Sequence, residues 1–132
     1  MNAMAYVLPW PPSVNRYWRA VGGRAILSRE GRQYRVDAQA AVLSTLPRLH
    51  IDAGRVELRI MAHAPDNRRR DLDNLLKGVL DALQTAGVYT DDSQVDSLTI
   101  TRGDVDRGRP RVVVQVREIE PEKRLADGVH AR

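Results

Sequence analysis

An apolar stripe over residues 72–83 constrains the fold more than any other feature of the sequence. Apolar side chains recur there at the three- and four-residue spacing of a single helix face: Leu72, Leu75, Leu76, Val79, Leu80 and Leu83. The stripe predicts a helix that begins at Asp71 and ends before Gly87, a residue suited to the position just after a helix end. Such a helix buries only one face, so a second layer of structure must pack against it.

Strand-like segments can provide that second layer. Residues 55–64 alternate, which predicts a half-buried strand with these side chains on one side: Val56, Leu58, Ile60, Ala62 and Ala64. Shorter strands are predicted at 4–9 and 25–27. Residues 97–101 and 111–119 are predicted to pair as a hairpin around a turn at 103–110.

A second helix is predicted from about Arg29 to Leu46, with Ser28 as its N-cap and Pro47 as its stop. One of its faces is expected to carry Tyr34, Ala38, Ala41, Val42 and Leu46. The order of elements predicts an α+β (mixed α/β) fold of two layers, in which a small mixed sheet packs against two main helices. The chain of 132 residues has room for one domain, over 1–120, with a flexible polar tail over 121–132.

Composition excludes several classes of protein. Cysteine is absent, which rules out disulfide scaffolds, thiol nucleophiles and cysteine metal sites. No apolar run approaches the roughly 20 residues of a membrane helix, and the first residues lack the features of a signal peptide. We therefore expect a cytoplasmic protein with no membrane partner. The absence of P-loop and GxGxxG patterns predicts that no organic cofactor binds.

The distribution of charge is more informative than the net charge of +4. Residues 1–70 hold 12 arginines and 5 acidic residues, whereas residues 71–106 hold 8 aspartates against Lys77 and Arg102. A basic surface with one acidic island is typical of a protein that binds a polyanion and carries a metal or catalytic site. Mixed surface charge without a function is the alternative interpretation.

Asp71 and Asp73 open the predicted leucine-striped helix and directly follow three arginines, residues 68–70. Acids at a helix start commonly cap backbone amides and complement the helix dipole, and this structural interpretation stays open. Lys77 follows Asp73 by one helical turn on the same flank, and it is one of only two lysines in the chain. A second acidic pair, Asp91–Asp92, follows the same helix across a short loop.

Carboxylates from two neighbouring loops can form a site with oxygen ligands only, which suits a hard cation such as Mg²⁺. With that ion, the same residues would polarise a phosphodiester and activate a water, while a nearby lysine offsets charge on the phosphate. The three histidines, at positions 50, 63 and 130, show no spacing typical of metal ligands. The DxD segment also follows three arginines rather than a buried strand, which argues against a haloacid-dehalogenase-type phosphatase.

Residues 71–95, DLDNLLKGVLDALQTAGVYTDDSQV, resemble the central motif of the RusA family of Holliday-junction resolvases. The family pattern has Asp-x-Asp-Asn, a lysine at the end of that turn, an Asp-Ala-Leu-like helix end, a glycine, and Asp-Asp-x-Gln-Val. Residues 8–19, LPWPPSVNRYWR, are similar to the opening segment of the family. The resemblance extends over roughly residues 5–118, although residues 20–54 are generic.

The resemblance implies a RusA-like fold and a homodimeric, Mg²⁺-dependent endonuclease (Mn²⁺ substituting) that nicks four-way DNA junctions symmetrically in recombination and repair, often from a prophage. It assigns the metal-binding catalytic carboxylates to Asp71, Asp73 and Asp92 and the catalytic lysine to Lys77, with Asp91 a weaker candidate. Charge and loop placement indicate further DNA contacts at Asn15, Arg16, Arg19, Arg68, Arg69 and Arg70.

Two other functions stay open at this stage. The first is a module of the same fold that binds branched DNA without cleaving it. The second is a small Mg²⁺ phosphohydrolase acting on a nucleotide, which would not need the basic first half of the chain. All the catalytic interpretations require the aspartates and Lys77 to converge in the assembled protein.

Overall fold

A four-stranded mixed sheet forms one layer of the computed structural model, which describes residues 3–121. Its strands are β1 (Ala3–Pro9), β4 (Arg55–His63), β5 (Val95–Arg102) and β6 (Arg111–Ile119), in the order β1-β6-β4-β5. The β6 strand is antiparallel to both β1 and β4, whereas β4 and β5 are parallel. The predicted strands at 4–9 and 55–64 are thus confirmed to within a residue or two.

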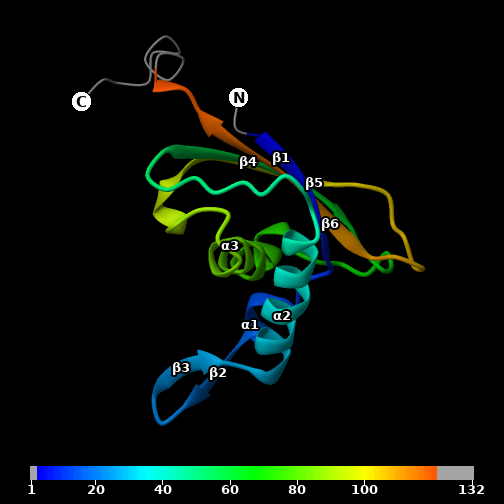
Figure 1. Cartoon of the computed structure of the whole chain (residues 1–132). Coiled ribbons are helices and arrows are strands. Elements are labelled where there is room, and N and C mark those ends of the chain that lie inside the picture. Colours follow the sequence, from blue (N-terminus) through cyan, green and yellow to red (C-terminus); the bar gives the residue numbers. More distant parts are fainter. Residues whose placement is uncertain (1–2, 122–132) are drawn as a thin grey trace.

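The helices α2 (Arg29–Leu43) and α3 (Leu76–Thr85) lie on the same side of this sheet (Figure 1). The short helix α1 (Val14–Tyr17) leads into a separate two-stranded hairpin, β2 (Trp18–Val21) and β3 (Arg24–Leu27), which projects away from the sheet. The two-layer α+β architecture expected from the sequence is confirmed. None of the helices in residues 3–121 is long and apolar enough to cross a membrane.

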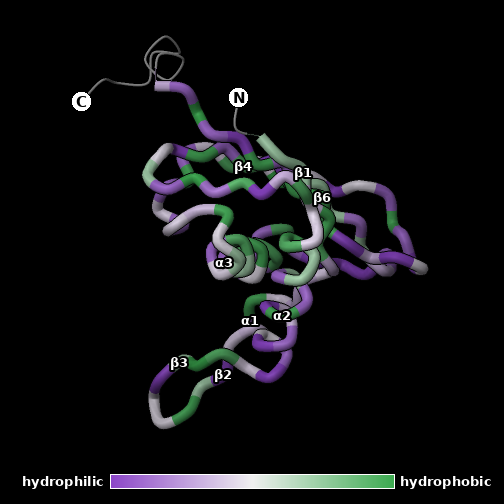
Figure 2. The backbone as a smooth tube through the Cα atoms, viewed as in Figure 1, coloured by the Kyte–Doolittle hydropathy of each residue, from purple (hydrophilic) through white to green (hydrophobic). Residues whose placement is uncertain are grey.

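The hydrophobic core lies between the sheet and the two long helices. Alternate residues of β4 are buried, as the sequence predicts. The β6 strand shows the same alternation, with Val112, Val114 and Val116 buried. Val79 and Leu83 of the predicted stripe are fully buried, and α3 is among the most apolar segments of the backbone (Figure 2). The helix ends at Thr85, and Gly87 has a φ of 85°, a left-handed conformation that favours glycine.

The predicted hairpin of residues 97–101 with 111–119 is wrong. The β5 strand pairs with β4 instead, since α3 carries the chain over the sheet as the crossover of a parallel β–α–β unit. The loop that follows β5 is held at the end of β4 by the Gly103 amide on the Ala62 carbonyl (2.9 Å) and by the Asp106 amide on the Ala64 carbonyl (2.8 Å). The loop therefore crosses the end of β4, and β6 then pairs with the other edge of β4.

The α2 helix ends three residues earlier than predicted. Ser28 caps its start, as expected, by accepting a hydrogen bond from the Gly31 amide (3.0 Å). At the other end, the hydroxyls of Ser44 and Thr45 each donate to the Ala41 carbonyl, which helps to end the helix before Pro47. Leu46 is consequently 75% exposed and does not lie on the buried face. The predicted flexible tail, apart from Pro121, lies outside the described residues.

Candidate active site and nucleic-acid surface

Asp71 and Asp73 lie where the chain enters a short 3-10 helix, η1 (Leu72–Leu75), that precedes α3. Asp71 occupies the N-cap position, but its carboxylate accepts no capping hydrogen bond. Both side chains are exposed, and neither carboxylate has a hydrogen bond or ion pair within residues 3–121. The capping interpretation of Asp71 is therefore wrong, and both carboxylates are available to a ligand.

The second acidic pair behaves differently. Asp91 caps η2 (Asp92–Gln94) by accepting a hydrogen bond from the Ser93 amide (2.8 Å), and Gln94 completes a capping box. Hydrogen bonds from the Ser93 amide and hydroxyl hold the pKa of the Asp91 carboxyl below its ordinary value. Asp91 is thus occupied by a structural task, which leaves Asp92 as the catalytic candidate of the pair.

The Asp-Asp-x-Gln segment is anchored to the body of the protein by two glutamines. The Gln94 amide group, which is buried, donates to the carbonyls of Ile51 (3.1 Å) and Gly54 (2.9 Å). The Asp92 amide donates to the Gln84 side-chain oxygen (3.0 Å). The loop that carries Asp92 is therefore fixed to the last turn of α3.

A single chain does not gather the predicted metal ligands. Gln84 places Asp92 near the end of α3, whereas Asp71 and Asp73 precede its first turn, and the helix between them is about 15 Å long. Across residues 3–121, no group of three or more histidine, aspartate or glutamate side chains is arranged to hold a metal ion. The donors are of the type that Mg²⁺ prefers, but one chain brings too few of them together.

Lys77 is exposed in the first turn of α3. Its ammonium nitrogen lies 5.7 Å from the centroid of the Trp18 ring, a cation–π distance. Trp18 is not among the site residues predicted from the sequence. The signal that could have indicated it was its place in the opening segment, residues 8–19, that resembles the family.

Beneath Trp18, three helices are joined by one acidic residue. The Tyr17 hydroxyl donates a hydrogen bond to Asp81 of α3, and Arg35 of α2 donates two, at 2.6 and 2.9 Å. Burial and the Asp81 carboxylate both raise the pKa of Tyr17 above its ordinary value, so the hydroxyl stays protonated. Asp81 is therefore a structural member of the acidic island.

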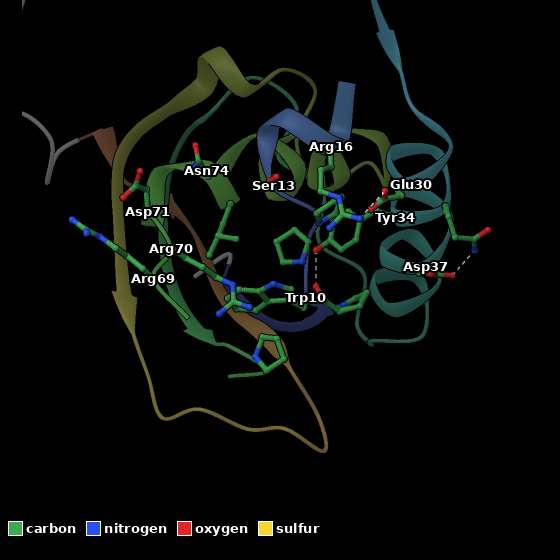
Figure 3. Close-up of a pocket in the computed structure, with 16 residues that line it drawn as sticks. Trp10, Ser13, Arg16, Glu30, Tyr34, Asp37, Arg69, Arg70, Asp71 and Asn74 are labelled. Atoms are coloured by element: carbon green, nitrogen blue, oxygen red, sulfur yellow. Dashed lines mark hydrogen bonds and ion pairs between the residues drawn. The ribbon is translucent and has the colours of Figure 1, made fainter. Parts of the chain in front are cut away.

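A cavity of about 820 Å³ opens beside Asp71. In Figure 3, Asp71 and Asn74 lie on one side of it, Arg16 and Glu30 lie on the other, and Trp10 lies between them. The cavity thus extends from Asp71 to the proline-rich segment that follows β1. Asn74, which belongs to the Asp-x-Asp-Asn pattern, and Trp10 are not among the site residues predicted from the sequence.

The three consecutive arginines differ in how far they are already engaged. Arg70 donates a 2.7 Å hydrogen bond to Asp66 and lies 5.7 Å from the Trp10 ring centroid, so its guanidinium stiffens the loop. Its hydrogen bond and that of the Arg68 amide lower the pKa of Asp66 to about 2. Arg68 is 3.6 Å from the same carboxylate but largely exposed. Arg69 is exposed and has no partner among the described residues.

The remaining DNA-contact candidates lie around α1 and the hairpin. Asn15 and Arg16 are exposed on α1, and Arg16 is 3.4 Å from Glu30. Arg19 is exposed on β2. These side chains and Arg69 are therefore accessible to phosphate groups, while Arg70 is the candidate most restrained by its own loop.

Comparison with known proteins matches residues 9–117 to a family model described as endodeoxyribonuclease RusA. The crossover junction endodeoxyribonuclease rusA of Enterobacteria phage HK97 is 41% identical over 120 residues, which cover 91% of this chain and 98% of that protein. The enzymes of the same name from Escherichia coli K12 and Enterobacteria phage 82 are each 43% identical over 108 residues, which cover 82% of this chain and 89% of theirs.

Proposed function

Because the chain belongs to the RusA family of endodeoxyribonucleases, we propose that it is a crossover junction endodeoxyribonuclease that resolves Holliday junctions by paired symmetric nicks. It would act on DNA in the cytoplasm, in recombination and repair. The observation that carries the proposal is the pair of exposed carboxylates at Asp71 and Asp73, which follow Arg69 closely in the chain; all three side chains lack a partner within residues 3–121.

Repulsion makes this arrangement hard to explain as a plain DNA-binding surface. A carboxylate beside a phosphate-binding arginine repels the phosphate backbone, so a protein that only grips DNA gains nothing from keeping two of them. A divalent cation between carboxylate and phosphate removes that repulsion. The non-cleaving branched-DNA module is therefore the weaker candidate, although it uses the same surface.

We assign the metal-binding role to Asp71, Asp73 and Asp92, with Mg²⁺ as the ion and Mn²⁺ as a substitute. When bound, such an ion polarises the phosphodiester and lowers the pKa of an attacking water. The residues of the chain itself have simpler tasks. Arg69 and Arg16 hold phosphates, and the Lys77 ammonium offsets negative charge that develops on the scissile phosphate.

A homodimer is part of the proposal for two reasons. Two symmetric cuts need two active sites related by a two-fold axis. In addition, one chain leaves Asp92 at the opposite end of α3 from Asp71 and Asp73, so a complete carboxylate set requires either a second copy or a rearrangement on binding DNA. A dimer can also cut both strands of a junction before the protein–DNA complex dissociates.

The test is cleavage of a synthetic four-way junction by the purified protein, with Mg²⁺ and with EDTA. Symmetric nicked duplexes that form only with the metal support the proposal, and a linear duplex of the same sequence serves as the control for structure specificity. A gel shift without any product in either Mg²⁺ or Mn²⁺ would instead establish the non-cleaving module.

A further inference from the structure

The root of the β2–β3 hairpin touches the first turn of α3 through one aromatic side chain. Trp18 is the first residue of β2, and its ring faces the Lys77 ammonium at 5.7 Å. The face of an indole ring carries negative charge density and attracts a cation at this distance. Lys77 is exposed and has four rotatable bonds, so this contact restrains a side chain that would otherwise sample many positions.

The Trp18 ring is itself held in place by a contact with the buried Tyr17 side chain. Tyr17 meets it edge to face, with ring centroids 5.3 Å apart and an interplanar angle of 82°. Tyr17 is fully buried and donates its hydroxyl proton to Asp81, which Arg35 binds with two hydrogen bonds. The ring is therefore positioned by three helices independently of the lysine.

We infer that Trp18 is a positioning residue for Lys77 and fixes the ammonium beside the start of α3, one turn after Asp73. The inference rests on the proposed function, in which Lys77 assists cleavage. Trp18 does not touch the reacting atoms in this scheme; it acts by reducing the number of positions that the lysine occupies before the substrate arrives.

The register of the hairpin adds a link to DNA. Trp18 pairs with Leu27 and Arg19 pairs with Ile26, so Trp18 and Arg19 point to opposite faces of the same strand. The inner face of β2 thus holds the lysine, while its outer face presents a candidate phosphate contact. A DNA arm bound at Arg19 would steady the strand that positions Lys77.

The first experiment is a double-mutant cycle in single-turnover junction cleavage with saturating protein. Trp18→Leu is expected to lower the cleavage rate about 3- to 30-fold, and Trp18→Phe, which keeps an aromatic face, less than threefold. In a Lys77→Ala background, Trp18→Leu should cause no further loss, because the side chain it positions is gone. Junction affinity and the melting temperature of each variant are measured in parallel.

The matched control is Trp10→Leu, the same substitution at the only other tryptophan, whose cation partner is Arg70. Its effect on cleavage should combine multiplicatively with Lys77→Ala. If Trp18→Leu also combines multiplicatively, Trp18 has only a structural role and the inference is overturned. If Lys77→Ala alone leaves the rate unchanged, it is the assignment of the lysine in the proposed function that fails.

A second measurement does not depend on activity. The chain has two lysines, Lys77 and Lys123, so the ε-methylene signals are readily assigned in ¹³C-lysine-labelled protein. Ring current from Trp18 should shift the Lys77 signal upfield of its position in Trp18→Leu, and the shift should persist in part in Trp18→Phe. A Lys77 signal at the same position in the unmodified protein and in Trp18→Leu would show that the ring does not hold the ammonium.

Discussion

The two acidic pairs that flank α3 look alike in the sequence and differ in what their carboxylates contact. Asp71 and Asp73 have no hydrogen bond or ion pair within residues 3–121, whereas Asp91 accepts the Ser93 amide inside a capping box. Only Asp92 of the second pair has a carboxylate outside that capping box.

The difference shows how to separate acids with a structural task from acids that await a ligand. A cap satisfies a backbone amide that would otherwise lack a partner, so its carboxylate stabilises the fold directly. An exposed carboxylate that has no hydrogen bond or ion pair makes no comparable contribution to the stability of the fold. The comparison therefore predicts opposite phenotypes for neighbouring aspartates.

The largest effect is expected for Asp73→Asn. The change removes a charge from the proposed metal site and should lower the cleavage rate by at least about a hundredfold, because metal stabilisation of the transition state is worth several kcal/mol. Junction affinity should stay the same or increase, since a negative charge near the phosphates is lost. Cleavage assays and gel shifts on the same junction measure both, and loss of binding together with cleavage would contradict the assignment of roles.

The second pair should divide between two phenotypes. Asp92→Asn is expected to lower cleavage strongly with little change in the free energy of unfolding. Asp91→Ala should lower that free energy by about 1 kcal/mol through loss of the cap, and cleavage should fall less than threefold. Urea denaturation and junction cleavage compare the two variants, and a reversed pattern would make Asp91 the catalytic member.

Asp81 tests the structural end of the same comparison. Asp81→Ala leaves the Tyr17 hydroxyl and the Arg35 guanidinium without their shared acceptor, and we expect a loss of about 1–3 kcal/mol in the free energy of unfolding. Arg16→Ala, which removes an exposed ion pair with Glu30, should cost less than about 1 kcal/mol. Equal losses for the two variants would show that the Asp81 cluster is no stronger than a surface contact.

Local patterns predicted most of the fold because buried faces of strands and helices require apolar residues at a regular spacing, which is visible in the sequence. The alternation from Val56 to Ala62 and the stripe of α3 are examples. The hairpin error has a non-local cause, since the partner of β5 depends on where the α3 crossover returns and on two amides bound to the end of β4. Residues 97–101 alone do not contain that information.

The candidate site was only partly accessible to sequence reasoning. The capping box of Asp91 with Gln94 has the recognisable spacing of an N-cap residue followed by glutamine three residues later, so the task of Asp91 was predictable. The contact between Trp18 and Lys77 joins residues far apart in the chain, and no periodicity reveals it. In the proposed function, which acids share an ion also depends on assembly and not on local sequence alone.

The arginines that precede Asp71 and Asp73 allow a similar comparison, with a smaller expected effect, between a guanidinium that already has a partner and one that has none among the described residues. Arg69→Ala should weaken junction binding and reduce the slope of log affinity against log salt by about 1, as expected for one lost phosphate contact. Arg70→Ala should change the slope less and lower the melting temperature instead, because its guanidinium already binds Asp66 and covers Trp10. Salt titrations of junction affinity compare them, and equal slopes would mean that Arg70 leaves Asp66 when DNA binds.

The smallest expected effect is on the pH dependence of the ion pair between Asp66 and Arg70. The Arg70 hydrogen bond is the main cause that lowers the pKa of Asp66 to about 2, below the roughly 3.9 of an unfolded chain. The stabilisation from this ion pair is thus complete above the unfolded pKa and is lost as the pH falls through that of the folded protein. In Arg70→Ala, carboxyl NMR titration should show the pKa of Asp66 rising toward its ordinary value, with Asp106, whose pKa is lowered by other partners, as the unchanged internal control. An unshifted Asp66 would mean that the Arg68 amide alone holds this loop, and that the loop before Asp71 is organised by its backbone, as the loop around Asp91 is.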